Sequence, residues 1–145
     1  MSAPAQTDKK KRSLQKKTQH HVIPKSRING KPLNPLKSDE FGKKYRKLFG
    51  ERDPFNALVF LVEDFWGGRW EFLVRAAAER SFEQKMLDRN EVILVGVKEK
   101  EHGNFHDVFE NMTPRETVVW LVVYYWNGEW EPVTKAIEYY AERKR

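Results

Sequence analysis

The sequence contains no cysteine, so the chain has neither disulfide bonds nor a thiolate metal site. It also lacks a long apolar run, because the longest, residues 118–126, is too short to cross a bilayer. The first residues lack the apolar core of a signal peptide. These absences predict an intracellular protein (cytoplasm or nucleoid, or nucleus in a eukaryote) with no membrane partner. Any metal ion would have to be bound by imidazoles or carboxylates.

Basic residues outnumber acidic ones by 27 to 21, which gives a net charge of +6. This excess favours a polyanionic partner, usually nucleic acid, and DNA is preferred here to RNA. Protein partners are not indicated. Residues 1–18 are small, polar and basic, and predict a flexible arm. Its cations either keep the chain soluble or bind the phosphate backbone; they are Lys9, Lys10, Lys11 and Arg12.

The second half of the chain repeats the first without a gap, at a constant offset of 60. Residues 45–85 match residues 105–145 through pairs such as Phe49 and Phe109, and Pro54 and Pro114. Each copy predicts a short helix, a capped helix, a two-residue break and a third helix. Thr113, Pro114 and Glu116 have the order of a capping box with proline at the first helical position.

Tryptophans recur at the break of each copy, as Trp66 and Trp70 and as Trp126 and Trp130. Such rings can stack on bases. Their repetition at helix corners instead predicts packing, in equivalent and mostly buried places in the two copies.

The four histidines of the chain occur as an adjacent pair, His20 and His21, and as His102 and His106. The spacing of the second pair places both imidazoles on one helix face, where they can share a metal ion. Residues 20–23 predict a short strand stopped by Pro24, and residues 91–97 predict a stronger strand that leads into the histidine helix. Neighbouring residues of a strand point to opposite faces, so the first pair can converge only where the strand ends or bulges.

The first copy has no histidine at the equivalent positions. Gly42 stands at the place of His102, and Arg46 at the place of His106. This difference assigns any metal chemistry to the second copy. The first copy is then either scaffold or a basic docking surface formed by Lys43, Lys44, Arg46 and Lys47.

The segment His-His-x-x-Pro-x-Ser, from His20 to Ser26, followed by His102-x-x-x-His106 resembles the HNH endonucleases (ββα-metal, or His-Me finger). The resemblance is closest to the colicin-type branch, whose metal site is all histidine. It implies one divalent metal ion (Zn, Ni, Mn or Mg, with a transition metal favoured) held by His20, His102 and His106. It also implies that His21 is the general base and that the residues just beyond it hold neighbouring phosphates; these are Lys25, Ser26 and Arg27.

In that family an asparagine between the strands orients the general base. Its slot, nine residues before the first helical histidine, holds Ile93 here. Asn90 is the nearest candidate for this catalytic role, although it would need a bulge or another register. Without an orienting partner the imidazole can adopt an unproductive rotamer or tautomer.

The sequence therefore predicts an α+β, mostly helical chain: a ββα-metal core (residues 19–34 and 89–112) with duplicated helical hairpin units. Residues 19–145 form a single domain, in which residues 45–85 are inserted between the strands. The expected function is metal-dependent endonucleolytic hydrolysis of nucleic-acid phosphodiester bonds. The alternative is a catalytically inactive HNH-like module that binds nucleic acid or a ribonucleoprotein. The long insertion and the missing asparagine favour the alternative, whereas His21 and Pro24-Lys25-Ser26 favour the enzyme.

Overall fold

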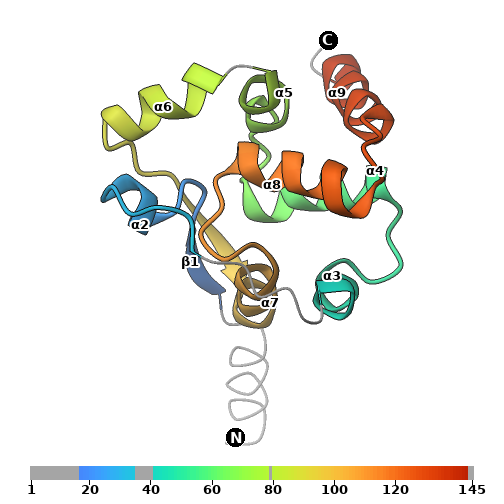
Figure 1. The fold of residues 1–145 in the computed structure, drawn as a ribbon, viewed down its shortest axis with the longest axis horizontal. Helices are drawn as coiled ribbons and strands as arrows, with labels where there is room; N and C mark the ends of the chain where they lie inside the picture. Colours follow the sequence, from blue (N-terminus) through green and yellow to red (C-terminus); the bar gives the residue numbers. More distant parts are fainter. Residues whose placement is uncertain (1–16, 35–40, 79, 144–145) are drawn as a thin grey trace, which may run out of the picture.

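The computed structural model describes residues 17–34, 41–78 and 80–143. It is mostly helical with one small antiparallel sheet (Figure 1). In chain order the elements are β1 (Lys17–His21), α2 (Lys25–Ile28), α3 (Phe41–Phe49), α4 (Pro54–Phe60), the π-helix η1 (Leu61–Phe65), α5 (Glu71–Ala78), α6 (Arg80–Asp88), β2 (Leu94–Lys98), α7 (Glu99–Phe109), α8 (Pro114–Trp120), the π-helix η2 (Leu121–Tyr125) and α9 (Glu131–Arg143). The predicted basic arm lies outside the described residues, apart from its last two.

Strands β1 and β2 pair antiparallel, with His20 opposite Val95. Strand β1 begins earlier in the chain than predicted, and β2 begins and ends later. The reason is that Lys17 to Gln19 pair with Gly96 to Lys98. The amide of Val22 continues the pairing by donating to the carbonyl of Ile93 at 3.0 Å. Helix α7 begins directly after β2, so the order strand, long excursion, strand, helix is present as predicted.

The duplicated units have the same order of elements. Helices α3, α4 and α5 and the π-helix η1 each have a counterpart sixty residues later, in α7, α8, α9 and η2. Asp53 and Thr113 cap the second helix of their units. The amide of Gly68 donates to Val62, and that of Gly128 to Val122, both at 2.7 Å. Local capping and turn chemistry thus impose one conformation on both copies.

The third helix of each unit packs against the second helix of the other unit. Helix α4 packs on α9, α8 packs on α5, and α3 packs on α7. Figure 1 shows this arrangement, with α5 and α9 at one end, α3 and α7 at the other, and α4 and α8 between them. Aromatic pairs cross between the units in the same reciprocal way: Phe65 stacks on Phe105 at 4.7 Å, and Tyr125 stacks on Tyr45 at 4.4 Å. One core therefore serves both copies.

The tryptophan prediction is correct for one pair and wrong for the other. Trp66 and Trp126 are buried, with 1% and 7% of their surface exposed. Trp70 is half-buried and lies parallel to Tyr140, with the ring centroids 6.4 Å apart. Trp130 is 43% exposed. The repeat has Arg80 at the position of Tyr140, so the aromatic partner of Trp70 is not duplicated.

Candidate metal centre

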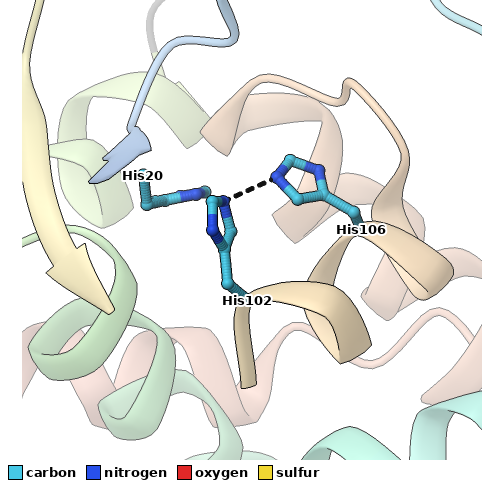
Figure 2. Close-up of side chains that lie close together, drawn as sticks. All are labelled: His20, His102 and His106. Atoms are coloured by element: carbon cyan, nitrogen blue, oxygen red, sulfur yellow. Dashed lines mark hydrogen bonds between the residues drawn. The ribbon is translucent and has the colours of Figure 1, made fainter. Parts of the chain in front are cut away.

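Three imidazoles from two elements meet at one point. His20 comes from β1, and His102 and His106 come from consecutive turns of α7 (Figure 2). One ring nitrogen from each lies within 4.8 Å of the others, which is close enough for a single metal ion to be held. The metal ligands implied by the HNH resemblance are thus brought together by the fold.

Aromatic packing fixes the orientation of α7 relative to β1. Phe105, Val108 and Phe109 form the buried face of this helix, and Phe105 stacks on Phe65 of η1. The face next to it then presents His102 and His106 toward β1. His20 sits on the same aromatic pair, with its ring edge-on to Phe105 at 4.8 Å and to Phe65 at 5.6 Å.

The rings of His102 and His106 each have a hydrogen-bond partner at Nδ1. His106 Nδ1 lies 3.0 Å from the carbonyl oxygen of Glu110, which can only accept, so Nδ1 carries the proton. Thr18 Oγ1 lies 2.6 Å from His102 Nδ1 and 3.4 Å from the carbonyl oxygen of Val97; when the hydroxyl donates to Val97, it accepts from His102 Nδ1. In that orientation of the hydroxyl both Nε2 atoms are lone-pair acceptors, 2.9 Å apart; in the other, His102 Nε2 donates a hydrogen bond to His106 Nε2.

This arrangement fits a divalent metal ion. Two lone pairs at such a distance repel unless a cation or proton lies between them. Metal-bound histidines usually donate their second nitrogen to a carbonyl or a similar acceptor, which fixes the ring. Zinc and related ions bind neutral imidazole nitrogens at about 2.0–2.1 Å. The three imidazoles are therefore close enough together, and of the right donor type, to hold a metal ion.

The burial of His20 is a second observation that fits a metal ion at this site. It is 2% exposed, and both of its ring nitrogens are buried without a hydrogen bond. Burial lowers the pKa of His20 to about 3, with further lowering from the charges of His106, His102 and His21. The ring is therefore neutral at pH 7, as a metal ligand must be. An unsatisfied buried polar group costs about 1–3 kcal/mol, which coordination would offset.

His21 lies beside the metal ligands without joining them. It ends β1, and its side chain lines a cavity of about 270 Å³ to which His102 and His106 also contribute. Because the strand ends here, both adjacent histidines can contribute to one site. His20 reaches it from the buried core, and His21 reaches it from the cavity. No described residue hydrogen-bonds the ring of His21. The other residues that line the cavity are Gln19, Pro24, Lys25, Ser26, Asn34, Glu110 and Asn111.

The three residues expected to hold phosphates divide into two groups. Lys25 and Ser26 line the cavity. Arg27 instead forms a two-pronged ion pair with Glu116, whose second contact, from Nη2 to Oε2, is 3.0 Å. Burial alone would raise the pKa of Glu116, but the hydrogen bonds and charge of Arg27 hold it below its ordinary value. Arg27 therefore ties α2 to the start of α8. Lys9, Lys10, Lys11 and Arg12 lie outside the described residues.

Asn90 lies in a different place from the one its expected role requires. It occupies a left-handed turn between α6 and β2, with φ of 51°, where it is exposed. It does not line the cavity next to His21. A turn of this kind favours asparagine for its backbone alone. The structure thus gives Asn90 a local reason to be present.

Asn111 is a site residue that the sequence did not reveal. It is buried, and its Nδ2 donates to Ser26 Oγ at 2.9 Å and to the Pro32 carbonyl at 3.0 Å. Its Oδ1 accepts from the amide of Asn34 at 2.6 Å. Asn111 thereby fastens the segment after β1 to the end of α7. Comparison of the copies could have found it, because its counterpart is the exposed Glu51.

Glu110 was also missed. It has φ of 51° and ψ of −120°, a backbone conformation that L-residues rarely adopt, and its counterpart is Gly50 with φ of 61°. Its carbonyl orients His106, and its side chain lines the cavity. Strained residues of this type concentrate at functional sites, where surrounding contacts hold them in place.

The chain matches no protein-family model, no curated protein and no solved structure. Among the described residues, no helix is long and apolar enough to span a membrane. The HNH resemblance stays a prediction, and the arguments for function come from the geometry.

Proposed function

We propose that this chain is a metal-dependent endonuclease that hydrolyses phosphodiester bonds of nucleic acid, DNA in preference to RNA. One observation carries the proposal. Three imidazoles converge on a point at the edge of a cavity, and a fourth, His21, lines that cavity without belonging to the ligand group. A metal-binding triad next to a general base is an arrangement that can hydrolyse a phosphodiester.

The residues have separate roles in this proposal. His20, His102 and His106 hold the ion, which supplies positive charge to the phosphate and the leaving oxygen when bound. His21 accepts a proton from the attacking water, whose oxygen bonds to phosphorus as the bond from phosphorus to the 3′ oxygen breaks. Imidazole is the side chain most often used as a general base. Lys25 and Ser26, in the same cavity, are placed to bind a neighbouring phosphate.

A second candidate function has its own supporting observation. No described residue hydrogen-bonds the His21 ring, so no side chain fixes its tautomer. A general base normally has such an orienting partner. This favours a non-catalytic module that uses the fold, with a structural metal, to bind nucleic acid or a ribonucleoprotein.

Substitution of His21 separates the two candidates. His21→Ala should keep about one metal equivalent and lose cleavage by about 10²–10⁴-fold, the usual effect of removing a general base. Gln19→Ala is the matched control, because Gln19 is on the same strand and lines the same cavity but cannot take a proton. His102→Ala should lose metal and cleavage together.

Cleavage is measured on supercoiled plasmid, single-stranded DNA and RNA with Mg, Mn, Ni or Zn. Equal losses in Gln19→Ala and His21→Ala would contradict the assignment of the base. Wild-type protein that binds metal and nucleic acid but cleaves none of these substrates would establish the binding module.

A further inference from the structure

The exposed charged side chains of helix α3 are all cationic. Leu48 and Phe49 are buried, and Tyr45 packs against Tyr125 and Trp126. The basic residues of the helix are Lys43, Arg46 and Lys47, which are exposed, and Lys44, which is half-buried; the helix contains no acidic residue. The buried apolar side fixes the orientation of α3 and leaves the cations on its outer side.

These cations repel one another and are not neutralised by neighbours. Lys43 is one helical turn from both Arg46 and Lys47, and like charges at that spacing destabilise a helix. In the described part of the chain, no carboxylate pairs with any of the four. Helix α9, by contrast, places Glu131 next to Lys135 at 3.2 Å. The helix dipole favours Arg46 and Lys47 in the last turn, but it does not remove the repulsion between them and Lys43.

The position of α3 relates it to the metal centre. It packs directly on α7, and it is the counterpart of α7 in the duplicated unit. Arg46 occupies the position of His106, and Gly42 that of His102. The same helix thus presents imidazoles in one copy and cations in the other, and the two copies lie side by side.

We infer that α3 is a second nucleic-acid contact, which binds the phosphate backbone next to the helix that carries the metal ligands. The inference rests on the proposed function only for the class of partner. Lysine and arginine on one helix face neutralise phosphates without reading sequence. A lipid surface fits less well, because a membrane-binding helix offers its apolar face to the lipid, whereas α3 buries its apolar side chains in the core.

The test is the salt dependence of binding by the double variant Lys43→Gln/Lys47→Gln. Binding to a 20-base-pair duplex is followed by fluorescence anisotropy in EDTA, at salt concentrations from about 50 to 200 mM. The slope of log K against log salt should become shallower by about two, since each lost phosphate contact contributes about 0.9. The matched control is Lys85→Gln/Arg89→Gln, which changes the net charge equally through exposed residues at the end of α6. It should leave the slope near the wild-type value.

Several outcomes would overturn the inference. These are an unchanged slope in the α3 variant, an equal change in the control, absence of duplex binding by the wild type, or retention on phosphatidylserine vesicles without binding to DNA. Cleavage assays with added metal report on the proposed function separately. A protein that binds through α3 but never cleaves would retain this contact and lose the nuclease assignment.

Discussion

We expect His20 to destabilise the metal-free protein and to stabilise the metal-bound protein, and the substitution His20→Leu tests this expectation. Its ring is buried against Phe65 and Phe105, with neither nitrogen hydrogen-bonded. Leucine keeps the apolar contacts and removes the unsatisfied polar atoms. In EDTA at pH 7 the variant should therefore be more stable than wild type by about 1–3 kcal/mol.

Metal should reverse this order. An ion at about 1,000 times its dissociation constant stabilises the folded wild type by about 4.1 kcal/mol. The variant has only His102 and His106 left as ligands and should gain far less. Wild type should then be the more stable protein, by about 1–3 kcal/mol on the same arithmetic.

The pH dependence of the metal-free protein gives an independent check. The folded-state pKa of His20, about 3, lies below its ordinary value of 6.5. Between these values the unfolded chain binds a proton that the folded chain does not, so stability falls as the pH falls. Lowering the pH from 7 to 5 should cost wild type about 2 kcal/mol through this residue, and the His20→Leu variant lacks that contribution.

Urea denaturation measures all three quantities, with the slope of the free energy against urea checked for constancy. His20→Met, with a flexible side chain of similar size, guards against a misfit that is specific to leucine. The reasoning is refuted if both variants are less stable than wild type in EDTA. It is equally refuted if Zn, Ni and Mn all leave the wild-type unfolding free energy unchanged.

Three further predictions concern neighbouring parts of the structure. Thr18→Val removes the acceptor of His102 Nδ1 and should weaken metal binding about 10–100-fold in competition with a chelating indicator, while urea unfolding in EDTA changes little. Glu110→Gly relieves the left-handed backbone and should raise the unfolding free energy by about 0.5–2 kcal/mol, and a loss of stability would show that its side-chain contacts outweigh the strain. Trp126→Ala should cost about 3–5 kcal/mol and the equivalent Trp130→Ala less than about 1 kcal/mol; equal losses in thermal unfolding would contradict the difference in their burial.

Much of the local structure could be predicted because its causes lie within a few residues of the chain. The capping box at Thr113 fixes the start of α8, and the glycine-containing breaks at Gly68 and Gly128 stop both π-helices in the same way. The spacing of His102 and His106 already placed two ligands on one helix face. The duplication was visible because similar residues recur at a constant spacing. Similar local sequences favour the same local structure.

Other features depend on contacts between distant segments, which no local pattern encodes. The sequence contains both third helices but does not specify that each packs on the other unit. The ion pair of Arg27 with Glu116 and the bonds of Asn111 to Ser26 likewise join parts of the chain that only folding brings together. For this reason Arg27 was expected at a phosphate, whereas it braces two helices.

The candidate metal centre shows which features follow from the sequence and which follow from the tertiary structure. The sequence by itself determined the donor types, their pairing on one helix and the absence of competing thiolates. Only the tertiary structure decided that His20 turns inward and His21 toward the cavity. The two adjacent side chains can serve one site because β1 ends at His21, just before the turn at Pro24. It also decided that Thr18 and Glu110 orient the helical rings. Donor chemistry belongs to the residue, but the direction of a ring nitrogen belongs to the packing around it.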